Sequence, residues 1–210
     1  MYDKKQDLKF KYIILFSFLF FSLSSIKLFS QVKFTNLEVF YKLTDSAASN
    51  LAQRIPSSHK NLNLNLVLGN SYNIFGNEII NSLTREGRNI LGENIKDSSS
   101  TIINFTIDNA KVTYGNLFRK SIFGDFHTTR NLILSGSYVL YYKDAKSYNF
   151  KYSYSDTVSV SDIKNIENPS YPFTQSKLPA EPIISSIYEP VIAVGVAAMT
   201  VILFFTVRSK

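Results

Sequence analysis

Seventeen consecutive uncharged residues, 191–207, stand near the end of the chain between Glu189–Pro190 and Arg208. A strand of that length would far exceed the usual 3–10 residues or so, and the run therefore predicts a helix. Pro190 suits the first turn of a helix, and a helix that is apolar on every side favours a lipid environment. We predict a transmembrane helix over 190–207 and a short tail over 208–210. A buried core helix is the alternative interpretation.

The N-terminus has the layout of a secretory signal peptide. Lysines precede an apolar run over 12–26, and the small residue Ser30 follows before Gln31. At ~1.5 Å per residue this run spans roughly 22 Å, which is shorter than a hydrocarbon core of ~30 Å. We predict a signal peptide over 1–30 that is cleaved after Ser30. An uncleaved signal anchor is the alternative.

The charges that flank the C-terminal run predict the orientation of the protein. Arg208 and Lys210 follow the run, and positive charge on one side of a span indicates the cytoplasmic side. We therefore predict a single-pass inner-membrane protein with a cytoplasmic C-terminus and a domain that faces the periplasm or the exterior. Ala193 and Ala197 form a small-xxx-small pair, so two such helices could associate into a homo-oligomer.

The composition excludes several classes of function. The formal net charge is +7, but residues 1–30 contribute +3 and residues 189–210 contribute +1, which leaves +3 on the 158 residues between them. No run of Lys and Arg marks this middle part, and we expect no nucleic-acid partner. The absence of cysteine excludes disulfides, a thiol nucleophile, Cys-ligated metals and a lipid-modified cysteine.

The first half of the exported part alternates between strand and helix patterns. We predict an extracytoplasmic domain over residues 31–161. Four leucines alternate with asparagine and valine over 62–68, which is the pattern of a half-buried strand. The other expected elements of this half are a strand over 32–43, a helix over 44–55, a helix over 71–86 and a short strand over 88–91.

From residue 101 the apolar period changes to two, which predicts strands. Three runs carry it, around 103–107, 132–140 and 148–154, and the "KDAKS" turn at 143–147 joins the last two as antiparallel neighbours. Helices near the front and a meander behind them predict an α+β fold. We expect a mixed, mostly antiparallel sheet of about 4–6 strands with two helices on one face.

Proline dominates the stretch that follows. Five of the six prolines lie between 162 and 190, and we predict a Pro-rich spacer over 162–189. At ~3.1 Å per residue, about 25 residues could reach roughly 75 Å if fully extended. The alternative is that the apolar segment 171–173 packs back on the sheet.

The sequence offers little chemistry. The only histidines are His59 and His127, and no Gly-x-Ser-x-Gly motif surrounds a serine. Asp156, Asp162 and Glu167 could contact calcium, but their spacing matches no EF-hand loop. We therefore expect no catalytic residue, no metal site and no cofactor.

A basic and aromatic cluster within residues 114–130 is the one candidate binding site. Arginine and lysine alternate there with phenylalanine, and such a hairpin can contact an anionic lipid headgroup, a glycan or an acidic protein surface. Alternatively, the phenylalanines belong to the core and the charges are simply solvated. The candidate residues are Phe118, Arg119, Lys120, Phe123, Phe126 and Arg130.

These features predict a non-enzymatic cell-envelope protein that is tethered to the membrane and binds or positions another envelope protein. A small periplasmic module that binds a ligand or lipid, with an apolar pocket beneath helix 71–86, is the first alternative. An enzyme that uses Asp/Tyr or Ser chemistry is the second. The order of elements over 60–160 resembles that of small periplasmic accessory domains, such as those of lipopolysaccharide-transport lipoproteins, and this resemblance implies no site residues.

Overall fold

The computed structural model describes residues 34–91, 100–121, 124–142, 144–180 and 183–208. The predicted signal peptide at 1–30 lies outside the described residues, as do Phe123 and the last two residues of the predicted tail.

The first element of the described residues is one long helix, α2 (Asn36–Arg54). Its N-terminus is a capping box, in which the Glu38 backbone N–H donates to Thr35 Oγ1 at 3.2 Å and the Thr35 N–H donates to Glu38 Oε2 at 2.7 Å. The predicted strand over 32–43 is therefore wrong, and the predicted helix at 44–55 is only the second half of α2. The reason is the helical spacing of the residues that face the core, which are Val39, Phe40, Leu43, Ala47 and Leu51.

A mixed six-stranded sheet forms the centre of the described domain, and its strands pair in the order β2-β1-β3-β5-β4. β3 and β4 pair with successive parts of one edge of β5, and β6 pairs with the opposite edge. β1 pairs in parallel with β2 and β3, and the other pairings are antiparallel. The expected α+β fold with a mixed sheet is confirmed. The strands are β1 (Asn61–Val67), β2 (Asn89–Leu91), β3 (Thr101–Tyr114), β4 (Phe118–Arg119), β5 (Phe126–Tyr141) and β6 (Ala145–Ser159).

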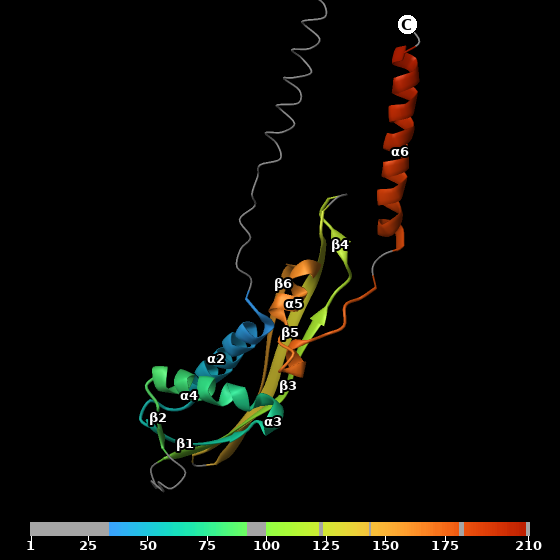
Figure 1. Cartoon of the computed structure of the whole chain (residues 1–210). Coiled ribbons are helices and arrows are strands. Elements are labelled where there is room, and N and C mark those ends of the chain that lie inside the picture. The colour runs from blue at the N-terminus through green and yellow to red at the C-terminus, as the bar shows by residue number, and fades with distance from the viewer. Residues whose placement is uncertain (1–33, 92–99, 122–123, 143, 181–182, 209–210) are drawn as a thin grey trace, which may run out of the picture. The chain divides into compact units, whose positions relative to one another are not determined.

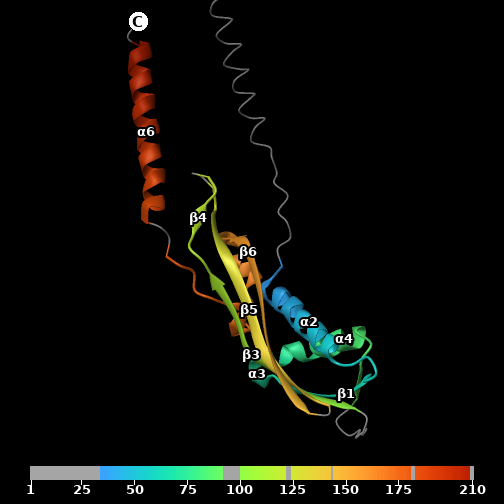
Figure 2. The same cartoon turned by 180° about the vertical axis from the view of Figure 1, so that it is seen from behind.

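The crossover from β1 to β2 holds the second group of helices. The predicted helix at 71–86 consists of α3 (Gly69–Tyr72), a 3-10 turn (Asn73–Phe75) and α4 (Gly76–Arg85). α2 and α4 lie on the same face of the sheet (Figures 1 and 2), as the sequence predicts.

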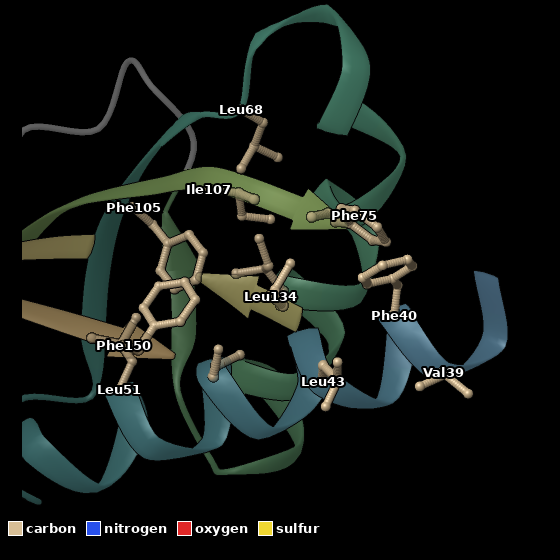
Figure 3. Close-up of a cluster of buried hydrophobic side chains, with 14 of the residues drawn as sticks. Val39, Phe40, Leu43, Leu51, Leu68, Phe75, Phe105, Ile107, Leu134 and Phe150 are labelled. Atoms are coloured by element: carbon tan, nitrogen blue, oxygen red, sulfur yellow. The ribbon is translucent and has the colours of Figure 1, made fainter. Parts of the chain in front are cut away.

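The hydrophobic core fills the space between these helices and the sheet (Figure 3). The Phe40 and Phe75 rings approach with centroids 6.4 Å apart, and the Phe105 and Phe150 rings stack at 5.3 Å. Leu134 lies between these two groups (Figure 3). Such aromatic contacts add to the stabilisation that burial of apolar surface provides.

Gly136 allows β5 to approach its neighbours β3 and β6 closely at the centre of the sheet. The register between β3 and β5 shifts between Ile107 and Asn109, and Gly136 pairs with Ile107 on one side and Phe150 on the other. A Cβ at this position would overlap the backbone oxygen of Thr106 and lie 2.6 Å from Phe150 Cζ. Only glycine leaves room for both neighbours.

The segment after β6 packs on the domain over residues 160–174. It forms a 3-10 turn (Val160–Asp162), α5 (Ile163–Ile166) and a second 3-10 turn (Pro172–Thr174). The Phe173 ring lies 5.4 Å from the Phe40 ring and 5.5 Å from the Phe75 ring, between centroids. In the first part of the predicted Pro-rich spacer over 162–189, the alternative of packing on the domain therefore applies, because the contacts of the partly buried Phe173 ring outweigh the extended preference of the prolines.

The last described element is α6 (Ile183–Arg208), which is 26 residues long. Pro190 lies inside this helix, so the helix begins seven residues before the position that the sequence predicted. Within the described residues, no helix is found whose length and apolar character suffice to cross a membrane. The side chains of Val191, Val194 and Phe205 are 60–69% exposed.

Candidate functional site

The predicted basic and aromatic cluster lies on a hairpin that extends β3 and β5. In β4, Phe118 pairs with His127 and Arg119 pairs with Phe126. Directly paired residues share a face of an antiparallel hairpin, so the two pairs occupy opposite faces. The Phe118 and His127 rings lie 6.1 Å apart, and the Arg119 guanidinium lies 4.1 Å from the Phe126 centroid. The second pair is a cation–π contact.

We call Phe118, Arg119, Lys120, Phe126 and His127 the hairpin surface. Phe118 is 40% exposed, and Lys120 is exposed beside it. The structure therefore brings four of the six candidate residues together. Phe123 lies outside the described residues, and the sixth candidate, Arg130, lies elsewhere.

Arg130 is fully buried, and its partners are internal to the domain. Its Nε and Nη2 donate to the two carboxylate oxygens of Asp156 at 2.8 and 2.6 Å. Its Nη1 donates to the backbone oxygen of Phe34 and to Asn36 Oδ1, both at 2.8 Å. This bidentate geometry is typical of a strong, positioning ion pair, and Arg130 is not available as a surface contact.

Asn36 carries the same network to the C-terminal segment. Its Nδ2 donates to the Tyr114 hydroxyl at 3.1 Å and to the Thr174 backbone oxygen at 2.7 Å. The Tyr114 hydroxyl in turn donates to Glu167 Oε1 at 3.0 Å, and that oxygen also accepts from the Ser176 N–H at 3.0 Å. We call the side chains that make these contacts the terminal network; they are Asn36, Tyr114, Arg130, Asp156 and Glu167.

Burial raises the pKa of the Tyr114 hydroxyl far above its ordinary value. The hydrogen bond from Asn36 lowers this pKa, and the Glu167 carboxylate raises it. Tyr114 therefore stays protonated and remains a donor to Glu167 under physiological conditions.

The terminal network lies at the end of the sheet from which the hairpin projects. Tyr114, Arg130 and Asp156 form one row across β3, β5 and β6. The chain is held at this row both where it enters the domain and where it leaves it, because Arg130 donates to the Phe34 carbonyl and Asn36 donates to the Thr174 carbonyl. Both chain ends of the domain thus emerge beside the base of the hairpin.

The residues considered for catalysis and calcium binding have structural partners. His127 Nδ1 lies 2.9 Å from the Asp125 backbone oxygen, and His59 Nδ1 lies 3.2 Å from Thr101 Oγ1. Asp156 binds Arg130, and Glu167 binds Tyr114. Across the described part of the chain, no group of three or more His, Cys, Asp or Glu side chains could hold a metal ion.

A cleft of about 250 Å³ lies at the opposite end of β5 and β6 from the hairpin. Arg54, at the end of α2, and Lys146, in β6, contribute positive charge to its lining. Asp144 contributes one carboxylate, and Tyr148 contributes an aromatic ring. The sequence placed a pocket beneath helix 71–86 instead, where the side chains of Phe75, Ile79 and Leu83 belong to the core.

The outer edge of β6 is a further feature that the sequence analysis missed. β6 is 15 residues long and pairs with β5 alone among the described strands. Its register with β5 runs from Tyr141↔Ala145 to His127↔Ser159 without a shift. The alternation at 148–154 predicted a strand, but an edge position depends on the topology of the whole sheet.

No family model matches this chain, and a search of the curated proteins finds no similar sequence.

Proposed function

We propose that this protein is a membrane-tethered, non-enzymatic component of the cell envelope, and that its exported domain holds another envelope protein by strand addition to β6. The observation that carries the proposal is the long, regular outer edge of this strand. An edge strand presents unpaired backbone N–H and C=O groups that a strand of a partner can pair with.

β6 lacks most of the features with which natural proteins protect an edge. Its sequence has no proline, and its register with β5 has no bulge. Lys146 and Lys151 are the two lysines along its length. A long edge without a kink favours pairing with a partner over solvation alone.

The membrane tether in this proposal is the C-terminal helix. Residues 191–207 are uncharged, and the described side chains of α6 are apolar and mostly exposed, as in Val194 and Phe205. Such side chains are costly to leave in water, and lipid removes that cost. The uncharged run 191–207 is about 26 Å long as a helix, and a bilayer can thin locally to match a short span, which offsets the limited length and apolar character of α6. In the proposed topology this run spans the inner membrane, the domain faces the periplasm or the exterior, and the C-terminus is cytoplasmic.

Site-specific photocrosslinking in the native membrane tests the partner. A photoreactive residue at Ser153, on the β6 edge strand, is compared with one at Ile102, which is exposed on β3 and paired on both sides, with Asn63 and with Tyr141. We expect a discrete adduct with another envelope protein at Ser153 and none at Ile102. No adduct at Ser153, or equal adducts at both positions, would contradict strand addition. A reporter fused after Lys210 should behave as cytoplasmic.

The cleft supports a second candidate function, the capture of a small ligand. Arg54 and Lys146 outnumber the one carboxylate of the lining, Asp144, and favour an anionic group, while Tyr148 offers an aromatic wall. Mass spectrometry of the denatured, purified protein would reveal a small molecule that copurifies with it, and this molecule should be lost in Lys146→Glu. Protein that carries no such molecule would count against this candidate.

A further inference from the structure

We propose that the hairpin surface rests on the anionic lipid surface of the membrane that holds α6. This inference depends on the membrane tether of the proposed function and adds to it a lipid contact and an orientation. Three observations carry it: the position of the chain ends, the length of the connection to α6, and the chemistry of the hairpin.

The terminal network determines which end of the domain is nearest the tether. The Ser176 N–H is bound to Glu167, whose other partner, Tyr114, is the last residue of β3. The hairpin begins directly after Tyr114. The chain that leads to α6 therefore departs from the base of the hairpin, and the opposite end of the sheet is the one remote from the tether.

The connection keeps the hairpin within reach of the membrane. Seven residue steps separate Ser176 from Ile183, where α6 begins, and at 3.3–3.6 Å per step they reach about 25 Å at most. The first eight residues of α6 add about 12 Å before the uncharged run begins at Val191. Five steps of extended chain from Tyr114 to Arg119 cover roughly 17 Å. The hairpin thus covers about half of the greatest distance that the connection allows, whereas the sequence alone suggested a much longer spacer.

The side chains of the hairpin suit the interface between lipid and water. Phe118 is a large apolar residue with 40% of its surface exposed. Lys120 is an exposed cation, and Arg119 places a second cation on the opposite face of the hairpin, where its guanidinium lies against Phe126. Asp125 offsets one of these charges, which leaves a net charge of +1. Aromatic rings enter the headgroup region, and basic residues are attracted to anionic lipids.

The natural absence of cysteine permits a direct test with the full chain. Lys120→Cys carries a single fluorescent label in protein reconstituted into vesicles, and Lys146→Cys, at the far end of β6, is the matched control. The vesicles contain phosphatidylcholine alone or with phosphatidylglycerol, together with a quencher attached to the lipid. We expect several-fold stronger quenching at Lys120→Cys than at Lys146→Cys in the anionic vesicles, and weaker quenching in the neutral ones. Added salt should reduce the difference.

The outcomes separate this inference from the proposed function. If the protein fails to float with vesicles after an alkaline wash, the tether itself is wrong. If it floats but quenching is equal at the two positions, the tether stands and the hairpin contact is refuted. A second change, Phe118→Ser, combined with Lys120→Cys, should lower the quenching, and unchanged quenching would also overturn the proposal. Protection of Lys120→Cys only when an envelope protein is added would assign the surface to a protein partner instead.

Discussion

Replacing Arg130 with methionine removes the central donor of the terminal network while it keeps an unbranched apolar side chain of similar length. Arg130 is fully buried, and the Asp156 side chain is only 22% exposed. The variant leaves this carboxylate without its bidentate partner. It also removes the donor from the Phe34 carbonyl and from Asn36 Oδ1.

The cost follows from the burial of these groups. Breaking a buried ion pair by removal of one partner destabilises a protein by about 3–5 kcal/mol. Water can reach part of Asp156, so we expect the lower end, about 3 kcal/mol in the free energy of unfolding. At roughly 4 °C per kcal/mol, this corresponds to a fall in Tm of about 12 °C.

Urea unfolding of the full chain in detergent, followed by tyrosine fluorescence, measures this cost. Lys151→Met is the matched control, because Lys151 is an exposed cation on β6, and we expect a change within about 0.5 kcal/mol. In the double variant Arg130→Met/Asp156→Leu, removal of the unpaired carboxylate should restore at least about 1 kcal/mol. A loss below about 1 kcal/mol in Arg130→Met would refute the reasoning, since it would mean that water already satisfies these groups.

Three further changes test other contacts. Gly136→Ala should lower the free energy of unfolding by more than about 2 kcal/mol, because the new methyl group would lie 2.6 Å from Phe150. Gly76→Ala is the control: its new methyl group has its nearest contact at 3.5 Å, and the same urea titration should show a change within about 1 kcal/mol. Phe173→Ala should cost about 3 kcal/mol and expose the segment after α5 to limited proteolysis; resistance equal to wild type would show that the segment does not depend on this ring. The pKa of Tyr114 is raised in the folded protein. Tyr114 therefore contributes its full stabilisation below pH 10, and this contribution falls as the pH rises above that value. Tyr114→Phe should therefore lose about 1 kcal/mol at neutral pH and show a shallower alkaline decline, and an unchanged decline would contradict this role.

The sequence predicted those strands and turns that a pattern of neighbouring residues determines. The leucine alternation from Leu62 corresponds to β1, and the "KDAKS" turn joins β5 to β6 with Tyr141 opposite Ala145. The first helix was not predicted in full, although its signal was present. Thr35 and Glu38 have the spacing of a capping box, but the apolar residues after them also fit a strand.

The candidate site was only partly predictable, because side chains of the same type can be either exposed or buried. Arg119 and Arg130 both lie in a basic and aromatic stretch, yet one stacks on an exposed hairpin and the other is buried. The difference arises from Asp156, which the register of β5 and β6 places opposite Arg130. A pairing between residues 26 positions apart depends on the assembled sheet, and no local pattern reports it.

The terminal network also constrains how the domain folds. Its hydrogen bonds join residues 94 positions apart, in Arg130 and Asn36, and 138 positions apart, in Asn36 and Thr174. Contacts between residues so distant in sequence form late during folding, because the entropy of closing large loops opposes them. The β5–β6 hairpin can form early. A chain that emerges gradually from its N-terminus therefore cannot complete this domain until Thr174 has emerged. In the proposed topology, folding and export would then finish almost together, shortly before α6 arrives.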